Sequence, residues 1–558
     1  MPRYRAGGRP VQPIRFLPRP SFSRAILLFF SLIFEISAIS TAMAQSGSSD
    51  TRENAVVTVG KVGAGVLMFH PLYISLGVER EISALIYGDG LLRRNESGAT
   101  EGALASLPTT ADGGRSWTFT LYSGIRFHDQ EFLTASDVVF SYQLYKQARA
   151  YDPVFHRYFQ NLEMVQTPDA RTVRFVMKEP VREFPSVLAT LPIMPKHQHD
   201  RRFFADAQAM MDPNRPIGLG PFRLETWPVY DTVILSANKN WHRGKPSLDG
   251  IVYRFYPSFD ELQAAFVRRE VDLIELDGAG SPVELKLARE SSKIHAVQPD
   301  RQMFVSLFYN NQHPMLSSKA VRQALTHATD RERIMSQVMM PGTGELAYSP
   351  VSSSFWANGN AVRYGYAPDR AQRILRAAGW QDKQKDGILR NGKQILQFEL
   401  IFPRGSVSAE KVVRLIKLNL SDIGVQVTPV PVEQKELVQR LRLGVYECAL
   451  YMQDFEPSPD GFYSMFHSES IELGFNMLRY GNRQVDRSIG FLFGIPDRAR
   501  ALPIYRGLQM QISEDQPCTF LYFITTRYVA YDARIQNVSR PGGARLNPPD
   551  SWFIREDR

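Results

Sequence analysis

Residues of the types that bind metals lie close together at one place in the sequence. His197, His199 and Asp200 fall within four positions, and side chains two residues apart share one face of a strand. Histidine nitrogens and carboxylate oxygens are common zinc ligands. The segment follows Pro192 and Pro195, which indicates a surface loop, and no His-x-x-x-His or cysteine pair accompanies it. We therefore predict that these residues form a loop and bind no metal.

Two glycine-containing stretches resemble loops that hold phosphates or ions. Residues 60–65 (GKVGAG) lack the Gly-Lys-Ser/Thr sequence of a phosphate-binding loop, so a turn is the better interpretation. A stretch that begins at Asp382 resembles the start of a calcium loop, but Lys393 stands where the bidentate glutamate belongs. A hairpin turn at residues 391–392 (NG) is therefore predicted there.

The search for catalytic machinery finds little. The chain contains no Gly-x-Ser-x-Gly elbow, and its 57 acidic residues show no pattern that marks a catalytic pair. With 558 residues, 44% hydrophobic and 22% charged, the chain has enough apolar residues for two to four packed domains and is not disordered, collagen-like or disulfide-dense. We predict a binding protein without catalytic residues, cofactor or metal, and no enzyme.

The positive charge of the chain is concentrated at its start. The first 24 residues contain six arginines and no acid, and a short apolar run and the small residues Ala42 and Ala44 follow. This pattern predicts a signal peptide over residues 1–44, cleaved near Ala44 for export to the periplasm. A membrane anchor is the alternative, but the apolar run of about 15 residues is shorter than the ~20 that span a bilayer. Removing the leader lowers the formal charge from +9 to +4, since it carries six Arg and one Glu. This near-neutral charge argues against nucleic acid as a partner.

The two cysteines leave their pairing open. Cys448 and Cys518 both lie in apolar runs, 70 residues apart. In an oxidising compartment they could form a disulfide, and two separate buried thiols are an equally good interpretation, because only geometry decides.

The rest of the chain mixes strands with helices. Alternation of apolar and polar residues predicts half-buried strands at 117–121, 173–177, 251–255 and 425–432. Helical spacing, with capping and stop residues, predicts helices that begin near 134 and cover 320–339, 368–379 and 408–423. No low-complexity linker separates these segments, so we expect α/β domains that are intertwined along the chain.

Seven sequence motifs follow one another in an order that is similar to a known family. They lie at 112–129 (DGGRSWTFTLYSGIRFHD), 133–141 (LTASDVVFS), 217–222, 240–249, 269–272, 320–331 and 378–380. The chain resembles the bacterial extracellular solute-binding proteins of family 5, the dipeptide-, oligopeptide- and nickel-binding components of ABC importers. Two departures are Gln130, where the family usually has glycine, and residues 459–461 (PDG), where the family has an Asp-Pro pair.

The resemblance covers about residues 55–535 and implies the fold. It implies an α/β, two-lobed periplasmic-binding-protein fold with a hinge and an additional small inserted domain. The implied boundaries are 45–90 with 215–300 and 525–558 for the first lobe, 91–214 for the inserted domain, and 301–524 for the second lobe. Closure of such lobes about a hinge traps a solute for a membrane permease.

The resemblance also implies the ligand-binding residues. Asp454 is the best match to the acid that holds a peptide's α-ammonium in relatives, with Glu456 as the alternative. Ser75 and Gly77 resemble the loop that runs along the ligand main chain. Further candidates are Arg363 and Arg404 for a terminal carboxylate, and Trp356 and Phe455 for side-chain pockets.

The function that the resemblance implies is capture of di- or oligopeptides by a monomer and their delivery to the permease of an ABC importer. Within the same fold, a nickel chelate, a sugar or an opine is the alternative solute. An exported hydrolase and a chaperone-like binder are readings from other classes. The first of these would require a catalytic constellation that the sequence lacks.

Overall fold

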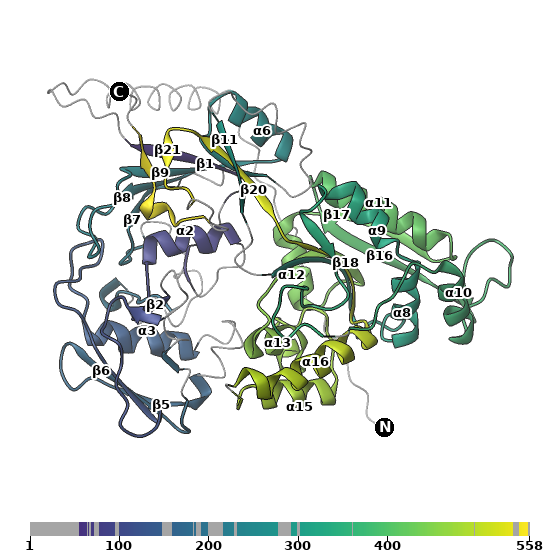
Figure 1. Cartoon of the computed structure of the whole chain (residues 1–558), viewed down its shortest axis with the longest axis horizontal. Helices are drawn as coiled ribbons and strands as arrows, with labels where there is room; N and C mark the ends of the chain where they lie inside the picture. Colours follow the sequence, from purple (N-terminus) through teal and green to yellow (C-terminus); the bar gives the residue numbers. More distant parts are fainter. Residues whose placement is uncertain are drawn as a thin grey trace, which may run out of the picture. The chain divides into compact units, whose positions relative to one another are not determined.

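A computed structural model shows two large mixed sheets flanked by helices (Figure 1). It describes residues 55–63, 65, 69–71, 77–94, 100–147, 159–181, 184–185, 191–198, 216–227, 232–276, 292–297, 302–359, 361–495, 497–539 and 546–555. The α/β class predicted from the sequence is confirmed, and so are the four predicted strands, which correspond to β4, β6, β9 and β17. The leader at 1–44 and its cleavage near Ala44 fall outside the described residues.

The first large sheet has seven strands in the order β11-β20-β10-β1-β9-β8-β7. The strands are β1 (Val56–Val62), β7 (Phe222–Thr226), β8 (Thr232–Ala237), β9 (Gly250–Tyr256), β10 (Leu273–Leu276), β11 (Ser292–Val297) and β20 (Arg527–Asp532). β1 runs parallel to both of its neighbours. Helix α2 (Gly77–Tyr87) contributes to the apolar core that β1, β8 and β9 share, and α6 (Phe259–Val267) packs with β10 in a second, smaller core.

A smaller sheet shares its core with the seven-stranded sheet. It has the order β4-β6-β5, with β4 (Ser116–Thr120), β5 (Leu162–Gln166) and β6 (Thr172–Met177), and α3 (Ala135–Gln147) packs against it. Its buried residues Phe119, Val173 and Phe175 belong to the same apolar cluster as Val57 and Tyr253 of the large sheet. The remaining short elements are β2 (Leu92–Arg94), β3 (Thr100–Gly102), β21 (Ile535–Gln536), β22 (Phe553–Ile554), η1 (Lys196–Gln198) and η4 (Pro549–Ser551).

The second large sheet has six strands in the order β13-β19-β12-β18-β16-β17. They are β12 (Gln302–Tyr309), β13 (Gly344–Leu346), β16 (Gln397–Pro403), β17 (Gln426–Val432), β18 (Cys448–Phe455) and β19 (Cys518–Ile524). Side chains alternate across β12, so Leu307 and Tyr309 enter one core while Phe304 and Phe308 enter another. The sheet is therefore covered on both faces, which explains why its central strands are apolar at nearly every position.

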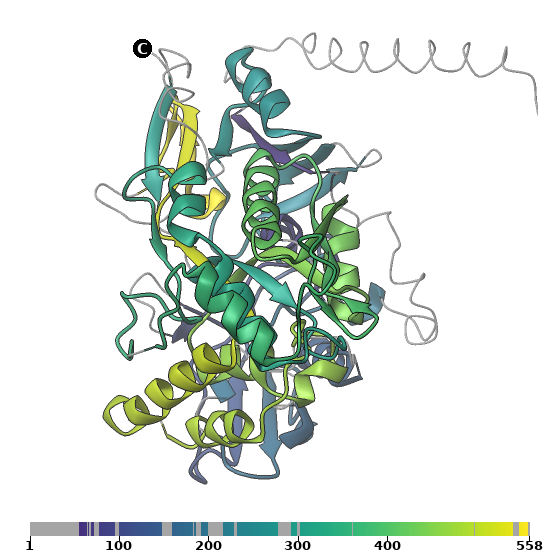
Figure 2. The ribbon, with the colours of Figure 1, turned by 90° about the vertical axis from the view of Figure 1, so that its right-hand side faces the viewer.

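Two groups of helices cover these two faces (Figures 1 and 2). One face is covered by α8 (Lys319–Ala328), α9 (Arg331–Val338), α10 (Pro368–Ala377) and α11 (Val407–Ser421). The other face carries α12 (Gln434–Leu443), α13 (Pro459–Phe466), α14 (Glu469–Glu472), α15 (Arg483–Leu492) and α16 (Arg498–Asp515). The hairpin predicted at 391–392 is confirmed by β14 (Arg390–Asn391) and β15 (Gln394–Ile395).

The single helix predicted at 320–339 is wrong, because the structure has two helices there. Thr329 ends α8 in an extended conformation, and Asp330 caps α9 by accepting a hydrogen bond from the Arg333 amide. A cap of this kind starts a new helix direction although the apolar spacing continues through it.

The two cysteines are free thiols on opposite sides of β12. Cys448 of β18 pairs with Tyr309 of β12, and Cys518 of β19 pairs with Phe308 of β12. Strands separated by a third strand lie about 10 Å apart, farther than the ~7 Å between Cα atoms that a disulfide allows. The two sulfurs also enter different cores. Of the two interpretations, the structure therefore has two separate buried thiols and no disulfide between them.

The chain passes from the six-stranded to the seven-stranded sheet through two residues, Thr525 and Thr526, between β19 and β20. Both backbone amides donate to the carbonyl oxygen of Thr343, at 2.8 and 3.2 Å. This crossover is short and its backbone is hydrogen-bonded.

A buried contact, which we call the glycine junction, joins His128 to Gly218 and Gly220 beside the end of α2. The amide of Gly220 donates to the carbonyl of Ile86 at 2.9 Å. The His128 ring accepts from the Gly218 amide at Nδ1 (3.3 Å), and its Nε2 lies 3.0 Å from the Gly220 carbonyl. A β-carbon on Gly220 would lie 2.2 Å from the carbonyl oxygen of Leu85, so this close approach requires glycine.

The glycine junction should make folding stability depend on pH. Burial is the main cause that lowers the pKa of His128, to about 4, whereas an unfolded histidine titrates near 6.5. The folded state holds the ring neutral, because its Nδ1 must accept the Gly218 hydrogen bond. The neutral His128 ring therefore contributes about 3 kcal/mol to the free energy of unfolding. This contribution is complete above pH 6.5 and is lost as the pH falls toward 4.

Urea unfolding between pH 8 and pH 4 measures this effect. The wild-type protein should lose unfolding free energy more steeply below pH 6.5 than the His128→Gln variant, whose side chain does not titrate. Equal slopes for the two proteins would show that His128 is not held neutral.

Candidate functional site

The predicted amine acceptor, Asp454, lies where β18 leaves the core of the six-stranded sheet. β18 is buried from Cys448 to Leu450, whereas Met452 and Asp454 are exposed. Asp454 stands opposite Met303 of β12. Its carboxylate forms no ion pair or hydrogen bond with any residue that the structure describes. The end of β18 thus presents an accessible carboxylate to solvent.

The chain turns sharply after Asp454, and we call residues 454–458 the β18 corner. The Ser458 amide donates to the Glu456 carbonyl at 2.8 Å, and the Ser458 hydroxyl caps α13 by accepting from the Gly461 amide. A β-carbon on Gly461 would lie 1.8 Å from the Glu456 carbonyl oxygen. Residues 459–461 (PDG) therefore form the first turn of α13, and glycine is required there.

Phe455 fixes this corner from inside the protein. It is 2% exposed, and its ring centroid lies 5.3 Å from that of Phe462 and 6.1 Å from that of Phe304. Phe455, which is predicted to line a side-chain pocket, packs in the apolar core of this structure. Its burial leaves the neighbouring acids, Asp454 and Glu456, on the exposed side.

An aromatic group lies beside the corner. Trp356 is 40% exposed, and its ring meets that of Tyr505 edge-on at 5.5 Å. Burial raises the pKa of Tyr505, and the negative charges of Asp460 and Glu456 raise it further, so this ring lies within electrostatic range of both acids. The structure thus brings Trp356 and Glu456 into one neighbourhood. Tyr505 comes from α16, and no local sequence signal predicted it.

The two predicted carboxylate-binding arginines have other neighbours. Arg404 is exposed, its Nε lies 3.2 Å from a Glu433 carboxylate oxygen, and its Nη2 donates to the Pro431 carbonyl. Arg363 is exposed, with its guanidinium carbon 5.1 Å from the centre of the Tyr348 ring. Neither has a contact with the β18 corner among the described residues.

Helix α2 contributes a cation that the sequence did not single out. Gly77 is its exposed first residue, while Ser75 lies outside the described residues. Burial raises the pKa of Tyr451 in β18, and the positive charges of Arg442 and Arg80 oppose that rise, while Asp454 adds to it. Arg80, one turn after Gly77, is therefore within electrostatic range of the strand that carries Asp454.

An ion-pair network holds α2 on its sheet. The ammonium of Lys61 lies 2.8 Å from Glu81 of α2 and 2.6 Å from Glu275 of β10, and Tyr253 donates to Glu81 at 2.9 Å. Arg527, directly after the crossover, pairs with Glu275. The charge of Lys61 lowers the pKa of Glu275 to about 2, with Arg527 adding to it. Lys61 therefore connects α2 to β10 through paired charges.

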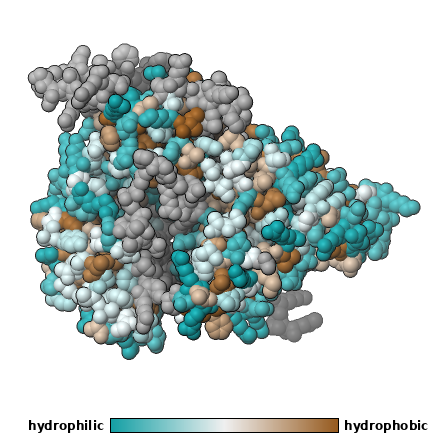
Figure 3. Space-filling view, viewed as in Figure 1, coloured by the Kyte–Doolittle hydropathy of each residue, from teal (hydrophilic) through white to brown (hydrophobic). Residues whose placement is uncertain are grey.

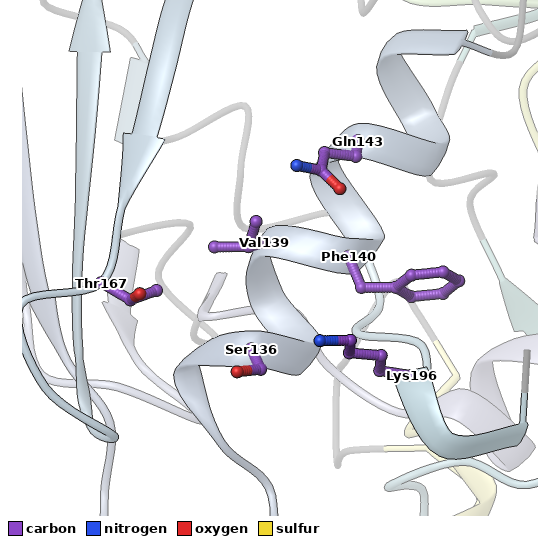
Figure 4. Close-up of a pocket in the computed structure, with 6 residues that line it drawn as sticks. All are labelled: Ser136, Val139, Phe140, Gln143, Thr167 and Lys196. Carbon is purple, nitrogen blue, oxygen red and sulfur yellow. The ribbon is translucent and has the colours of Figure 1, made fainter.

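The remaining predicted or enclosed features do not build a reaction centre. His197 lies 2.6 Å from Asp129, whereas His199 and Asp200 are outside the described residues. A pocket of about 120 Å³ (Figure 4) is lined by Ser136, Val139, Phe140, Gln143, Thr167 and Lys196. It is smaller than the ~300–1,000 Å³ typical of small-molecule sites. Within the described ranges, no group of three or more His, Cys, Asp and Glu side chains could hold a metal ion.

One further property concerns membranes. In the part of the chain that the structure describes, no helix combines the length and apolar character needed to cross a bilayer.

Comparison with known proteins gives three informative relatives. The oligopeptide-binding protein AppA of Bacillus subtilis is 28% identical over 505 residues, 89% of this chain and 91% of that protein. The solved structure of AppA in complex with a nonapeptide matches with a TM-score of 0.80 and 26% identity, over 90% of this chain and 99% of that one. The dipeptide-binding protein of Escherichia coli is 25% identical over 440 residues, 75% of this chain and 80% of that protein.

The third relative shows the fold alone. NikZ of Campylobacter jejuni in complex with Ni(L-His) matches with a TM-score of 0.76 at 19% identity, over 89% of this chain and 99% of that one.

A family model supplies the assignment. The model described as "Bacterial extracellular solute-binding proteins, family 5 Middle" matches residues 99–472, well over half of the chain. The structural matches assign the two-lobed architecture of these proteins, and members of the family bind solutes and catalyse no reaction. This chain therefore belongs to the bacterial extracellular solute-binding proteins of family 5 and is an exported binding protein, not an enzyme.

Proposed function

We propose that this protein captures di- or oligopeptides between its two lobes and delivers them to the permease of an ABC importer. The observation that carries the proposal is the exposed Asp454 carboxylate, which has no cationic partner among the described residues at the end of β18. A peptide's α-ammonium would supply that partner through a charge-assisted hydrogen bond. The names of the relatives, an oligopeptide-binding and a dipeptide-binding protein, support a peptide ligand.

The other proposed ligand contacts are those that the family resemblance implies. Asp454 accepts the amine, and Glu456 is the alternative acceptor. Backbone groups of Ser75 and Gly77 bind the ligand main chain, which leaves the ligand side chains free to vary. Trp356 packs against a ligand side chain.

The terminal carboxylate of the peptide needs a cation. Arg363 and Arg404 remain the proposed candidates, and Arg80 joins them because its charge reaches β18. Arg404 has the weaker case, since Glu433 already neutralises part of its charge.

The proposed lobes are those predicted from the sequence, 45–90 with 215–300 and 525–558, and 301–524, with 91–214 as the inserted domain. The crossover at Thr525 and Thr526 is one proposed hinge strand, because it is the short connection between the two large sheets. Bending at such a connection closes the lobes over a solute.

The working protein in this proposal is a periplasmic monomer. Its leader, residues 1–44, is cleaved near Ala44. Amino-terminal sequencing of the exported protein should begin at or near Gln45.

Calorimetry with paired peptides tests the proposed ligand class. A peptide with a free α-amine should bind at least about tenfold more tightly than its N-acetylated form, because acetylation removes the charge that Asp454 accepts. Native mass spectrometry of protein purified from its source should reveal a bound mass that matches a peptide. A bound nickel chelate, sugar or opine, together with equal affinities for the two peptides, would overturn the peptide proposal.

A further inference from the structure

A positively charged surface lies on the six-stranded half and includes none of the residues proposed to bind the solute. It comprises α10 and the loop and hairpin that follow, residues 366–396, and we call it the α10 basic surface. This range contains seven Lys and Arg and three Asp and Glu, a net charge of +4. The whole chain without its leader also carries +4, so this short range has the same net positive charge as the whole chain without its leader.

The charges of the α10 basic surface point to solvent. Arg370, Arg373 and Arg376 recur every three residues along α10 and are all exposed, whereas Ala371 and Leu375 on the other side of the helix are buried. α10 packs through that buried side against α8. Spacing of three residues keeps the three arginines on one side of the helix.

The loop and hairpin extend the same charge. Lys383, Lys385 and Lys393 are exposed, and in the described part of the chain none of them has an ion-pair partner. Figure 3 shows this region, at the end that carries α10, as a hydrophilic surface.

The acids of this range are largely engaged within it. Asp386 pairs with Arg390 at 2.7 Å, and Asp382 accepts hydrogen bonds from the amides of Asp386 and Gly387. The three arginines of α10 and the three lysines of the loop and hairpin therefore face solvent. On α10 itself, Asp369 is the exposed acidic residue.

The composition of the surface indicates what kind of partner it fits. Tyr366 is the only exposed large apolar residue between 366 and 396, all of which the structure describes. Packed protein interfaces have cores enriched in aromatic residues and depleted in lysine. A surface of flexible Lys and Arg side chains without apolar anchors instead matches a diffuse layer of negative charge, such as anionic lipid headgroups.

We propose that the α10 basic surface binds anionic phospholipid and thereby keeps the protein at the membrane surface. Each basic side chain near an anionic bilayer strengthens binding about fivefold. The interaction is electrostatic and reversible, and it leaves the β18 corner available for solute.

Vesicle sedimentation tests this proposal with a chain that begins at Gln45, so that the leader arginines do not contribute. That chain contains the whole compact unit Asn54–Arg558. It should bind vesicles of phosphatidylglycerol and phosphatidylcholine at about 0.1 M salt and release them at about 1 M, since the Debye length falls from about 10 Å to about 3 Å. It should not bind vesicles of phosphatidylcholine alone.

Two triple variants separate the surface from total charge. The variant with Arg370→Gln, Arg373→Gln and Arg376→Gln keeps good helix formers and should bind anionic vesicles about a hundredfold more weakly. The control variant with Lys178→Gln, Lys239→Gln and Lys293→Gln removes the same charge from exposed, scattered positions. It should retain most of the binding.

The outcomes are distinguishable from those of the solute proposal. Equal losses in the two triple variants, or no binding of the wild-type chain to anionic vesicles, would overturn the membrane proposal. Solute affinity measured by calorimetry should be the same in the wild type and in both triple variants, whichever way the vesicle result falls.

Discussion

Replacing Asp454 by alanine should weaken the binding of a peptide with a free α-amine by about 2–5 kcal/mol, the usual cost of truncating one partner of a buried charge pair. Dissociation constants should rise about 30-fold to about 5,000-fold. The reason is specific to this position: the carboxylate is exposed without ligand and has no cation beside it in the described structure. A closed lobe would remove water from the pair and strengthen it.

Calorimetry on five proteins measures this effect: the wild type, two variants of Asp454 and one variant each of Glu456 and Glu472. Asp454→Asn should behave like Asp454→Ala, because it keeps the shape and removes the charge. Glu472→Ala removes an exposed carboxylate from the same half of the molecule and should leave affinity unchanged. The N-acetylated peptide should bind the wild type and Asp454→Ala equally. Unchanged affinity in Asp454→Ala with a large loss in Glu456→Ala would transfer the role to Glu456.

The Gly220→Ala variant should lose about 4 kcal/mol of unfolding free energy, at the upper end of single-residue effects. A fraction of the variant molecules should fail to fold. The added β-carbon would lie 2.2 Å from the Leu85 carbonyl oxygen and 2.6 Å from that of Ile86. Both contacts are with backbone at the end of α2, so neither can be relieved by rotating a side chain.

Denaturant unfolding with a matched glycine measures this loss. Gly507 lies exposed inside α16, with nothing within 4 Å of an added β-carbon. Gly507→Ala should therefore stabilise the protein by about 0.5–1 kcal/mol, because alanine is the better helix former. Similar unfolding free energies for the two alanine variants would falsify the steric account of the glycine junction.

The sequence motifs that identified the family describe its scaffold. Arg322 donates to the carbonyls of Gln516, Leu316 and Asp515, at 2.8 to 2.9 Å. Asp272 accepts from the Thr58 amide at 2.8 Å. Residues of this kind close buried backbone hydrogen bonds, so their pattern predicts the fold well. They do not touch the β18 corner, which is why the same motifs say little about the ligand.

One departure from the family pattern has a physical explanation. Gln130 has φ of 76°, in the left-handed region that favours glycine. Its backbone carbonyl accepts from Arg126 at 2.7 Å, and its side-chain oxygen accepts from Asn240 at 2.9 Å. The sequence could predict that a turn lies here, and only the structure shows which contacts hold a non-glycine residue in it.

The residues that the sequence could not predict come from distant segments. Tyr505 of α16 lies within electrostatic range of Glu456 although about 50 residues separate them, and Arg80 of α2 lies within electrostatic range of β18 across more than 350 residues. Local patterns carry no information about such approaches. The break between α8 and α9 was also missed, because apolar spacing continues through Thr329 and Asp330 and only the cap marks the change of direction.

The position of β12 between the two cysteines has a consequence for how the protein matures. An exported chain meets oxidising enzymes while it folds, and two thiols could be joined at that stage. Once β12 has paired with both neighbours, the sulfurs lie on separate strands and in separate cores. Burial also raises the pKa of both thiols, which keeps them in the unreactive protonated form. The finished protein therefore needs no oxidative step to reach its native state, and it should tolerate reducing and oxidising surroundings alike.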